Sequence, residues 1–289
     1  MIQNKFITYL SSEKRFSEHT IKSYSTDLKQ FTSFLSSEFQ IIDEINEISF
    51  QIIRTWIASL LEKGINPRSV NRKISTLKTY FKFLIREGEL IENPMIKVVA
   101  PKSKKRLPIF IEEDQIKSLL NEVQFESGFI GQRNKLIIEL FYVTGIRLSE
   151  LINIKISDVD FSNQSIKVLG KRKKERIIPL SSSMINSLDN FIKNNHKNHF
   201  LFTNLDGVKL YTKLVYRVVN KYIAKISSVN KKSPHILRHT FATHMLNNGA
   251  DINAIKELLG HANLSATQVY THNTIEKLKI VYKQAHPRA

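Results

Sequence analysis

The sequence predicts a mostly α-helical protein of two domains, the second of which contains a small β-sheet. Apolar residues recur every three or four positions over most of the chain, which is the period of an amphipathic helix. Over residues 164–182 they alternate around a Gly-Lys turn, which is typical of a β-hairpin. Three prolines and several basic residues in residues 92–110 favour a boundary there. We therefore expect a helical domain over residues 1–95, a basic linker over 96–109 and a mixed α/β, mainly helical domain over 110–289.

The N-terminal domain is expected to contain several amphipathic helices separated by capping and breaking residues. Ser17 and Ser49 each precede an apolar run at helical spacing and have the side-chain oxygen that an N-cap requires. Gly64 and Gly88 follow two such runs, and glycine readily adopts the left-handed conformation that ends a helix. These residues therefore predict where the helices begin and end.

The helix predicted between Gly64 and Gly88 has a basic polar side. No acidic residue lies between Lys63 and Arg86. Exposed helices usually interleave acids and bases, so this imbalance favours contact with DNA phosphates over a simply solvated cationic face. The basic residues of this helix are Arg68, Arg72, Lys73, Lys78, Lys82 and Arg86.

The overall charge favours a polyanionic partner. The chain has 44 Lys and Arg against 26 Asp and Glu, for a net charge of +18, and residues 101–289 alone carry a net +15. Nucleic acid is the partner that such a field suits best, although a lysine-rich composition inherited from an AT-biased genome is the alternative. The lack of cysteine excludes disulfides and thiolate metal sites. With no secretory signal and no apolar run long enough for a membrane span, we expect a cytoplasmic protein without membrane contact.

Arg147 is predicted to lie in a turn between two buried helices of the C-terminal domain. The apolar run Leu136–Val143 stops at Thr144-Gly145, and a new helix begins with the letters LSEL. A guanidinium group at such a place is costly unless an anion accompanies it. Glu150 either is that partner or orients Arg147 toward an outside anion.

The hairpin of residues 164–182 has a basic tip, Lys171–Lys174. Such a tip suits the groove of a nucleic acid, where it would bring a lysine to a phosphate; a solvated loop is the alternative. A helix over residues 184–195, a short strand and turn over 199–210 and a helix over 211–229 are expected to follow.

Residues 233–271 place His235, Arg238, His261 and Tyr270 in a short stretch with helix and turn signals. Phosphoryl transfer to a protein nucleophile requires a hydroxyl group, fixed cations on the nonbridging oxygens and a proton donor for the leaving oxygen. Tyr270 supplies the hydroxyl, Arg147 and Arg238 the cations, and Lys171 or a histidine the proton. No metal ion is then required.

Three other interpretations of this stretch compete. His235 and His239 have the spacing of a zinc-binding helix, but Ile236 stands where a metalloprotease needs glutamate. Residues 251–272 have the helix and turn signals of a helix-turn-helix motif, which would contact DNA bases through Ser265 and its neighbours. For any one of these residues, a satisfied structural role in the core is the default.

Four sequence boxes together resemble those of a known family. They are TGIRLSEL, GKRKKERIIPL, HILRHTFATHMLNNGAD and LLGHANLSATQVYTH, and the chain ends in HPRA. Over nearly its whole length the chain resembles the tyrosine recombinases of the phage integrase family, and among them the bacterial Xer recombinases that resolve chromosome dimers. The resemblance implies Glu150 as a supporting acid, and Lys171 is preferred to Lys173 and Lys174 because it directly follows Gly170. It implies the catalytic set Arg147, Lys171, His235, Arg238, His261 and Tyr270.

The resemblance also implies fold, mechanism and partners. The fold would be a SAM-like core-binding domain followed by a tyrosine recombinase catalytic domain. Tyr270 would form a 3′-phosphotyrosyl link while Lys171 protonates the departing 5′ oxygen, without cofactor, metal or ATP. Four protomers, of one kind or with a paralogous recombinase, would act on two specific DNA sites, with the C-terminal helix docking on a neighbour and a DNA translocase as possible accessory. A mobile-element integrase or invertase, a type IB topoisomerase-like enzyme and a DNA-binding regulator that does not cleave are the alternatives.

Overall fold

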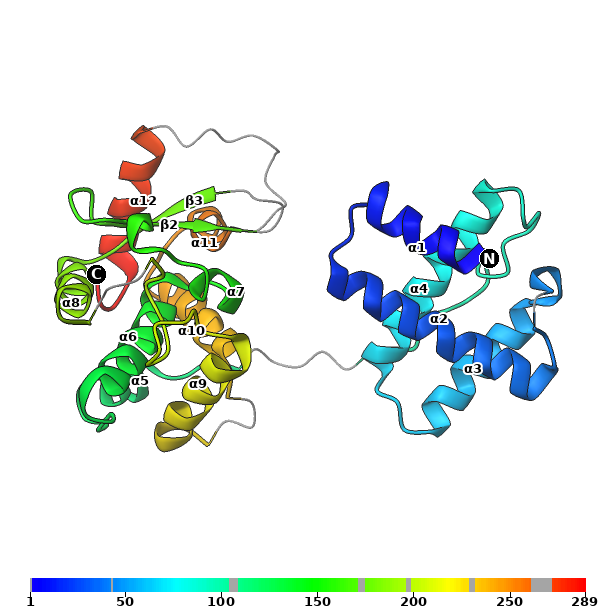
Figure 1. Cartoon of the computed structure of the whole chain (residues 1–289), viewed down its shortest axis with the longest axis horizontal. Helices are drawn as coiled ribbons and strands as arrows, with labels where there is room; N and C mark the ends of the chain where they lie inside the picture. The colour runs from blue at the N-terminus through cyan, green and yellow to red at the C-terminus, as the bar shows by residue number, and fades with distance from the viewer. Residues whose placement is uncertain are drawn as a thin grey trace. The chain divides into compact units, whose positions relative to one another are not determined.

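The computed structural model describes residues 2–42, 44–103, 109–170, 175–195, 199–228, 232–260 and 272–289. The chain divides into two compact units, Met1–Arg106 and Leu107–Ala289, here called the N-terminal and C-terminal units (Figure 1). Within the described residues, no helix combines the length and the apolar character needed to cross a lipid bilayer.

The N-terminal unit is built from helices, as expected. Ser17 and Ser49 are N-caps whose side chains accept hydrogen bonds from the backbone N–H groups of Thr20 and Ile52, which confirms both predicted starts. Gly64 and Gly88, just beyond two of the helices, have φ angles of 74° and 73°. The elements are α1 (Ile2–Ser12), α2 (Glu18–Phe39), the 3₁₀ turn η1 (Ile45–Glu47), α3 (Phe50–Glu62) and α4 (Pro67–Arg86).

A buried carboxylate on α2 connects this helix to α4 through hydrogen bonds inside this unit. Asp27 of α2 is fully buried and accepts hydrogen bonds from Arg72, from Lys73 Nζ at 2.8 Å and from Thr76 Oγ1 at 3.1 Å. Lys73 is therefore buried too, at 5% exposure, and its place on the predicted solvent-facing basic side is wrong. The carboxylate explains the exception, because a lysine is buried only when an anion accompanies it.

The segment that follows α4 packs on the N-terminal unit. Met95 and Val98 are buried in its core. The Asn71 side chain of α4 donates a hydrogen bond of 3.0 Å to the carbonyl oxygen of Pro101. Part of the segment expected as linker is thus attached to the first unit.

The C-terminal unit is mainly helical with one small antiparallel sheet. The predicted hairpin is present as β2 and β3, and the two-residue β1 adds a third strand, in the order β1-β2-β3. Residues 199–210 do not form the expected strand: they contribute only isolated bridges, Lys155 with Phe200 and Thr203 with Lys209. The elements are α5 (Glu113–Asn121), α6 (Gly128–Thr144), α7 (Leu148–Leu151), η2 (Ile156–Asp158), β1 (Val159–Asp160), β2 (Ser165–Leu169), β3 (Glu175–Pro179), α8 (Ser182–Asn195), α9 (Thr212–Ile226), α10 (Pro234–Asn247), α11 (Ile252–Leu259) and α12 (His272–Ala285).

The helix α6 forms the centre of this unit. It is buried on nearly every side from Leu136 to Thr144 and packs against α8, α9 and α10. Gly145 ends it with a φ angle of 58°, and a Cβ atom there would lie 2.6 Å from the Phe241 ring of α10. This close contact of the turn with α10 places Arg147, two residues later, beside the start of α10.

The last helix, α12, packs on its own unit against β3, α10 and α11 (Figure 1). Leu278 and Tyr282 are buried, and so is His286 just beyond the helix. The His286 Nε2 atom lies 3.3 Å from the carbonyl oxygen of Tyr142 on α6, and its ring stacks on Tyr282. In this single chain, the segment expected to dock on a neighbouring protomer therefore contributes to its own core.

Candidate active site

The start of α10 and the turn after α6 together line one cavity. Its volume is about 350 Å³. Pro234 occupies the first turn of α10, and His235 and Arg238, three residues apart, both reach the cavity from this helix. The lining residues are Ile146, Arg147, Leu148, Tyr216, Ser233, Pro234, His235 and Arg238. The structure thus brings together three of the six residues predicted to be catalytic.

Glu150 holds Arg147 in the turn between α6 and α7. The Glu150 Oε1 atom accepts a hydrogen bond of 2.7 Å from Arg147 Nη1, and its Oε2 accepts one of 2.8 Å from the backbone N–H of the same residue. Arg147 Nη2 also donates to the carbonyl oxygen of Gly260 at 3.0 Å. The expected anionic partner of Arg147 is therefore Glu150, which simultaneously fixes the orientation of the guanidinium group.

Arg238 is a buried guanidinium held by two main-chain carbonyl groups. Its Nη1 donates to the oxygen of Gly145 at 2.7 Å and its Nη2 to the oxygen of Leu259 at 2.8 Å. Burial, and after it the positive charges of Arg147 and Arg176, lowers the pKa of Arg238 to about 10. The group is still a cation at neutral pH, and its remaining N–H donors are available to an anion in the cavity.

Arg176 belongs to the same cluster, and the sequence interpretation missed it. It is 4% exposed and pairs with Glu150 through two hydrogen bonds of 2.8 Å. In the sheet it lies opposite Val168, two positions before Ile178, so alternation places it on the buried face. That position is the signal in the sequence, because a basic residue on the inward face of a strand needs a buried anion.

Glu150 is consequently shared by two arginines. Burial alone would raise the pKa of this carboxyl group, but the hydrogen bonds and charges of Arg176, followed by those of Arg147, lower it to about 2. The carboxylate therefore stays ionised over the whole physiological range and balances one of the clustered positive charges.

His235 stands at the exposed mouth of the cavity. Burial, followed by the nearby His239 and Arg238, lowers the pKa of His235, which favours the neutral ring at physiological pH. The rings of His235 and His239 are 4.3 Å apart between centroids. Among the described residues, no group of three or more His, Cys, Asp or Glu is arranged to hold a metal ion.

The other three predicted catalytic residues, Lys171, His261 and Tyr270, lie outside the described residues. The same holds for the second helix of the helix-turn-helix alternative, with Ser265. Two described residues adjoin them in the chain: Gly170 directly precedes Lys171, and Gly260 directly precedes His261.

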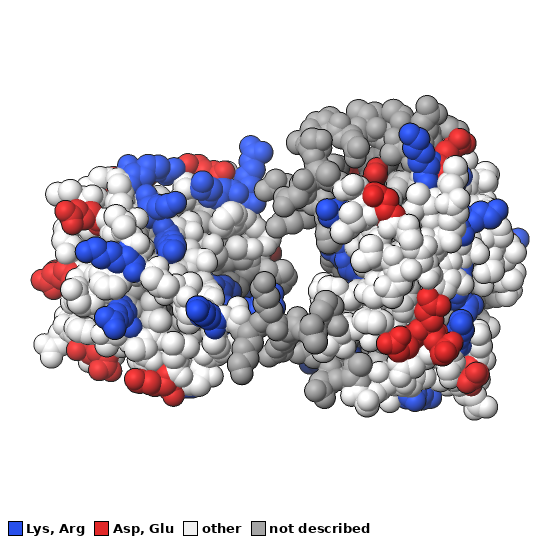
Figure 2. All heavy atoms as spheres, turned by 180° about the vertical axis from the view of Figure 1, so that it is seen from behind, with Lys and Arg blue, Asp and Glu red and all other residues white. Residues whose placement is uncertain are grey.

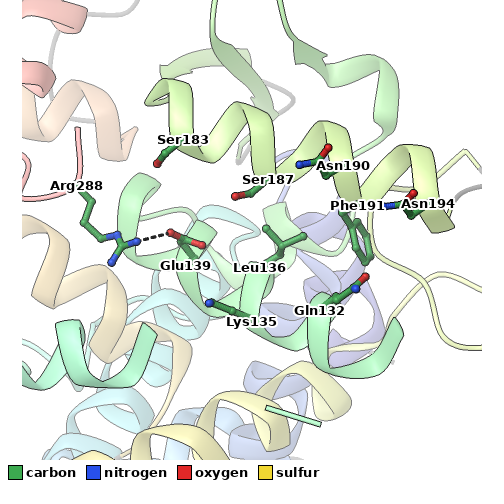
Figure 3. Close-up of a pocket in the computed structure, with 10 residues that line it drawn as sticks. All are labelled: Gln132, Lys135, Leu136, Glu139, Ser183, Ser187, Asn190, Phe191, Asn194 and Arg288. Carbon is green, nitrogen blue, oxygen red and sulfur yellow. Dashed lines mark ion pairs between the residues drawn. The ribbon is translucent and has the colours of Figure 1, made fainter. Parts of the chain in front are cut away.

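A second cavity of the C-terminal unit, of about 380 Å³, lies between α6 and α8 (Figure 3). Arg288, near the chain end, reaches its edge but is already paired with Glu139 at 3.1 Å. No histidine is among its lining residues, and half of them carry amide or hydroxyl groups. The cavity at α10 is therefore the better candidate for a phosphate group.

The basic side of α4 remains largely exposed despite the burial of Lys73. Arg68, Lys78 and Lys82 face solvent, as does Arg72 apart from its contact with Asp27. Helix α4 passes behind α1 and α2 in Figure 1, and from that side Figure 2 shows Lys and Arg spread over the N-terminal unit with acids toward its outline. This surface suits a polyanion.

Two family profiles match the chain. The profile of the "Phage integrase, N-terminal SAM-like domain" matches residues 4–88, and that of the "Phage integrase family" matches residues 109–277. The chain belongs to the phage integrase family, the tyrosine recombinases. Its boxes around Arg147, Lys171, His235, His261 and Tyr270 all fall inside the second match.

Relatives and solved structures agree with this assignment. The tyrosine recombinase XerC of Staphylococcus carnosus is 40% identical over 293 residues, which span 100% of this chain and 98% of the relative. The XerH site-specific recombinase bound to difH substrate shares the fold with a TM-score of 0.69 and 24% identity, over 90% of this chain and 78% of that one. A lambda integrase tetramer bound to a Holliday junction gives a TM-score of 0.71 at 21% identity, over 92% of this chain and 74% of that one. The predicted family and fold are thereby confirmed.

Proposed function

We propose that this tyrosine recombinase cuts and rejoins double-stranded DNA at a specific site through a 3′-phosphotyrosyl intermediate on Tyr270. The observation that carries the proposal is the fixed pair of guanidinium groups, Arg147 and Arg238, beside His235 in one cavity. Two cations held by carbonyl and carboxylate oxygens are preorganised to bind the nonbridging oxygens of a phosphodiester, where negative charge develops during phosphoryl transfer.

The remaining steps follow from the chemistry of phosphoryl transfer. The Tyr270 oxygen forms a bond to phosphorus while the bond from phosphorus to the 5′ oxygen breaks. Lys171 gives that oxygen its proton, and His235 and His261 assist through hydrogen bonds and proton transfer. A 5′-hydroxyl group of a partner strand then attacks the phosphotyrosyl link and releases Tyr270. One phosphoester replaces another at each step, so the reaction needs no external energy source.

We further propose that the recombinase resolves chromosome dimers before cell division. The full-length identity to proteins named XerC supports this role more than that of a mobile-element integrase or invertase. The lambda integrase that shares the fold is a tetramer on a Holliday junction, which supports a tetramer of this chain, alone or with a paralogue, on two DNA sites. A DNA translocase as accessory and a cytoplasmic location complete the proposal.

The cleavage reaction can be tested in two stages. Wild-type protein is incubated with fragmented genomic DNA of its source, and the retained sequence is identified. A duplex of that sequence with a nick beside the cleavage position, called here the nicked duplex, is then used to trap a covalent protein–DNA adduct. We expect an adduct that resists denaturant and maps to Tyr270 by mass spectrometry.

The Tyr270→Phe variant is the matched control, because it keeps the ring and removes the nucleophile. It should retain the duplex without forming the adduct. An equal amount of adduct from this variant would show that Tyr270 is not the nucleophile. If the wild type retained the duplex without forming an adduct, the protein would be a DNA-binding regulator that does not cleave. Retention of a single chromosomal site near the replication terminus fits dimer resolution, whereas retention of element ends contradicts it.

A further inference from the structure

Three arginines from three separate elements bind three consecutive carbonyl groups at the C-terminal end of α11. Arg176 Nε donates to the oxygen of Leu258 at 2.7 Å, Arg238 Nη2 to that of Leu259 at 2.8 Å, and Arg147 Nη2 to that of Gly260 at 3.0 Å. The arginines come from β3, from α10 and from the turn before α7. We call the carbonyl groups of residues 258–260 the carbonyl platform.

The carbonyl platform is a favourable place for cations. The last carbonyl groups of a helix lack partners within the helix and carry the negative end of its dipole. Each guanidinium group satisfies one of these oxygens and gains from the dipole. The position of α11 therefore determines where the guanidinium groups of Arg147 and Arg238 lie.

Arg176 differs from the other two because it does not line the cavity. All three nitrogen atoms of its guanidinium group donate within the protein: Nη1 and Nη2 to the Glu150 carboxylate, and Nε to the carbonyl oxygen of Leu258. Glu150 in turn fixes Arg147. Arg176 thus links the Glu150 carboxylate to the end of α11 and fixes the distance between them.

We propose that Arg176 is a positioning residue, which sets the geometry of the phosphate-binding pair Arg147 and Arg238 by fixing Glu150 against the carbonyl platform. This inference rests on the proposed function and deepens it. Chain connectivity gives it a second consequence: Arg176 is five residues after Lys171, and the platform ends directly before His261. One side chain thereby makes hydrogen bonds at positions that lie close in the chain to both of these proposed catalytic groups.

The Arg176→Lys variant tests the proposal. Lysine keeps the positive charge but cannot make the three directed hydrogen bonds of the guanidinium fork. With the nicked duplex at saturating protein, we expect the single-turnover rate of adduct formation to fall by about 100-fold, the effect of a misplacement of roughly 1 Å. The affinity for the same duplex should change far less than the rate, since Arg176 does not reach the cavity and the two arginines act mainly on the charge that develops during the transfer.

Arg133→Lys is the matched control for burial and charge. Arg133 of α6 is also a buried arginine, at 5% exposure, whose guanidinium group donates to a main-chain carbonyl, that of Thr203, at 2.9 Å. Its hydrogen bonds go to Thr203 and Asn134 and not to the carbonyl platform. This variant should lose stability of the same order while it cleaves at the wild-type rate.

A glycine pair provides a second test that leaves every arginine in place. Gly260 has a φ angle of 66°, and an added Cβ atom would lie 3.1 Å from Arg176 Cδ and 3.2 Å from its Nη1. Gly249 has a φ angle of 85° and open space around its Cβ position. Both Ala variants carry the strain of a left-handed residue, but only Gly260→Ala displaces Arg176. We expect slow cleavage from Gly260→Ala and normal cleavage from Gly249→Ala.

Chemical rescue separates positioning from a merely structural role. In Arg176→Ala, guanidinium chloride at low, non-denaturing concentration should restore cleavage, whereas sodium chloride at the same ionic strength should not. A folded Arg176→Lys that cleaves at the wild-type rate would overturn the proposal. If that variant does not fold, equal cleavage by the two glycine variants would overturn it instead. If the wild type formed no adduct, the proposed function itself, and not the positioning role of Arg176, would be wrong.

Discussion

Replacing Glu150 with glutamine should destabilise the C-terminal unit strongly. The side chain of Glu150 is 2% exposed, and its two oxygens accept four hydrogen bonds: two from Arg176, one from the side chain of Arg147 and one from the backbone N–H of Arg147. Glutamine has nearly the same shape, but its NH₂ group faces donors, and the charge that balances the arginines is lost.

The expected loss follows from the burial of the cluster. Removal of one partner from a buried ion pair costs about 3–5 kcal/mol, because the opposite charge is left uncompensated. A domain of this size loses roughly 2–4 °C in melting temperature per kcal/mol, which predicts a decrease of about 10 °C. The Glu139→Gln variant is the comparison: Glu139 is also buried, but its partner Arg288 is partly exposed and can be solvated when left unpaired, so this variant should cost less than Glu150→Gln.

The two units can be followed separately in this experiment. The only tryptophan of the chain, Trp56, is buried in the N-terminal unit, so its fluorescence follows that unit alone. Far-UV circular dichroism reports both units. Glu150→Gln should lower the dichroism transition that does not coincide with the fluorescence transition, and it should leave the fluorescence transition unchanged. A melting temperature within 2 °C of the wild type would refute the view that Glu150 neutralises a buried cationic cluster.

Three other predictions concern different parts of the chain. Asp27→Asn should destabilise the N-terminal unit by about 3 kcal/mol, seen in Trp56 fluorescence on urea titration, because it leaves a buried lysine without its anion; an unchanged midpoint would contradict this. Lys78→Ala and Lys82→Ala should each reduce the slope of log affinity against log salt by about 1 if they contact DNA phosphates, and an unchanged slope would exclude that contact. Burial lowers the pKa of His286 to about 3, so below pH 6.5 this side chain takes up a proton in the unfolded chain but not in the folded chain. Between pH 6.5 and 5 the free energy of unfolding, measured by urea titration, should therefore fall by about 2 kcal/mol more in the wild type than in His286→Asn. Parallel pH dependence of the two proteins would show that His286 is protonated in the folded state.

The local features of the fold could be predicted from the sequence because they depend on near neighbours. Ser17, Ser49 and Asp251 cap helices through hydrogen bonds to backbone groups within three residues. Gly145 and Gly260 end helices because the chain there needs a left-handed residue. The pairing of Arg147 with Glu150 belongs to the same class, since the two residues are three positions apart. The family boxes indicated which residue types to expect at the site.

Contacts between distant segments establish which charged side chains are paired internally and which remain for a ligand. Lys73 and Lys78 belong to the same basic helix, yet the buried Asp27, 46 residues away from Lys73, takes one of them into the core. Arg176 lies just beyond the basic hairpin tip in the sequence, but Glu150, 26 residues earlier, and the end of α11, 82 residues later, make it part of the site. The caps and the periodic faces could be predicted from the sequence because they depend on short-range geometry, whereas the residue types proposed to be catalytic came from the family boxes. The partners of buried charges depend on which distant segments meet, and electrostatic pairing in a low-dielectric interior then selects among otherwise equivalent arginines and lysines.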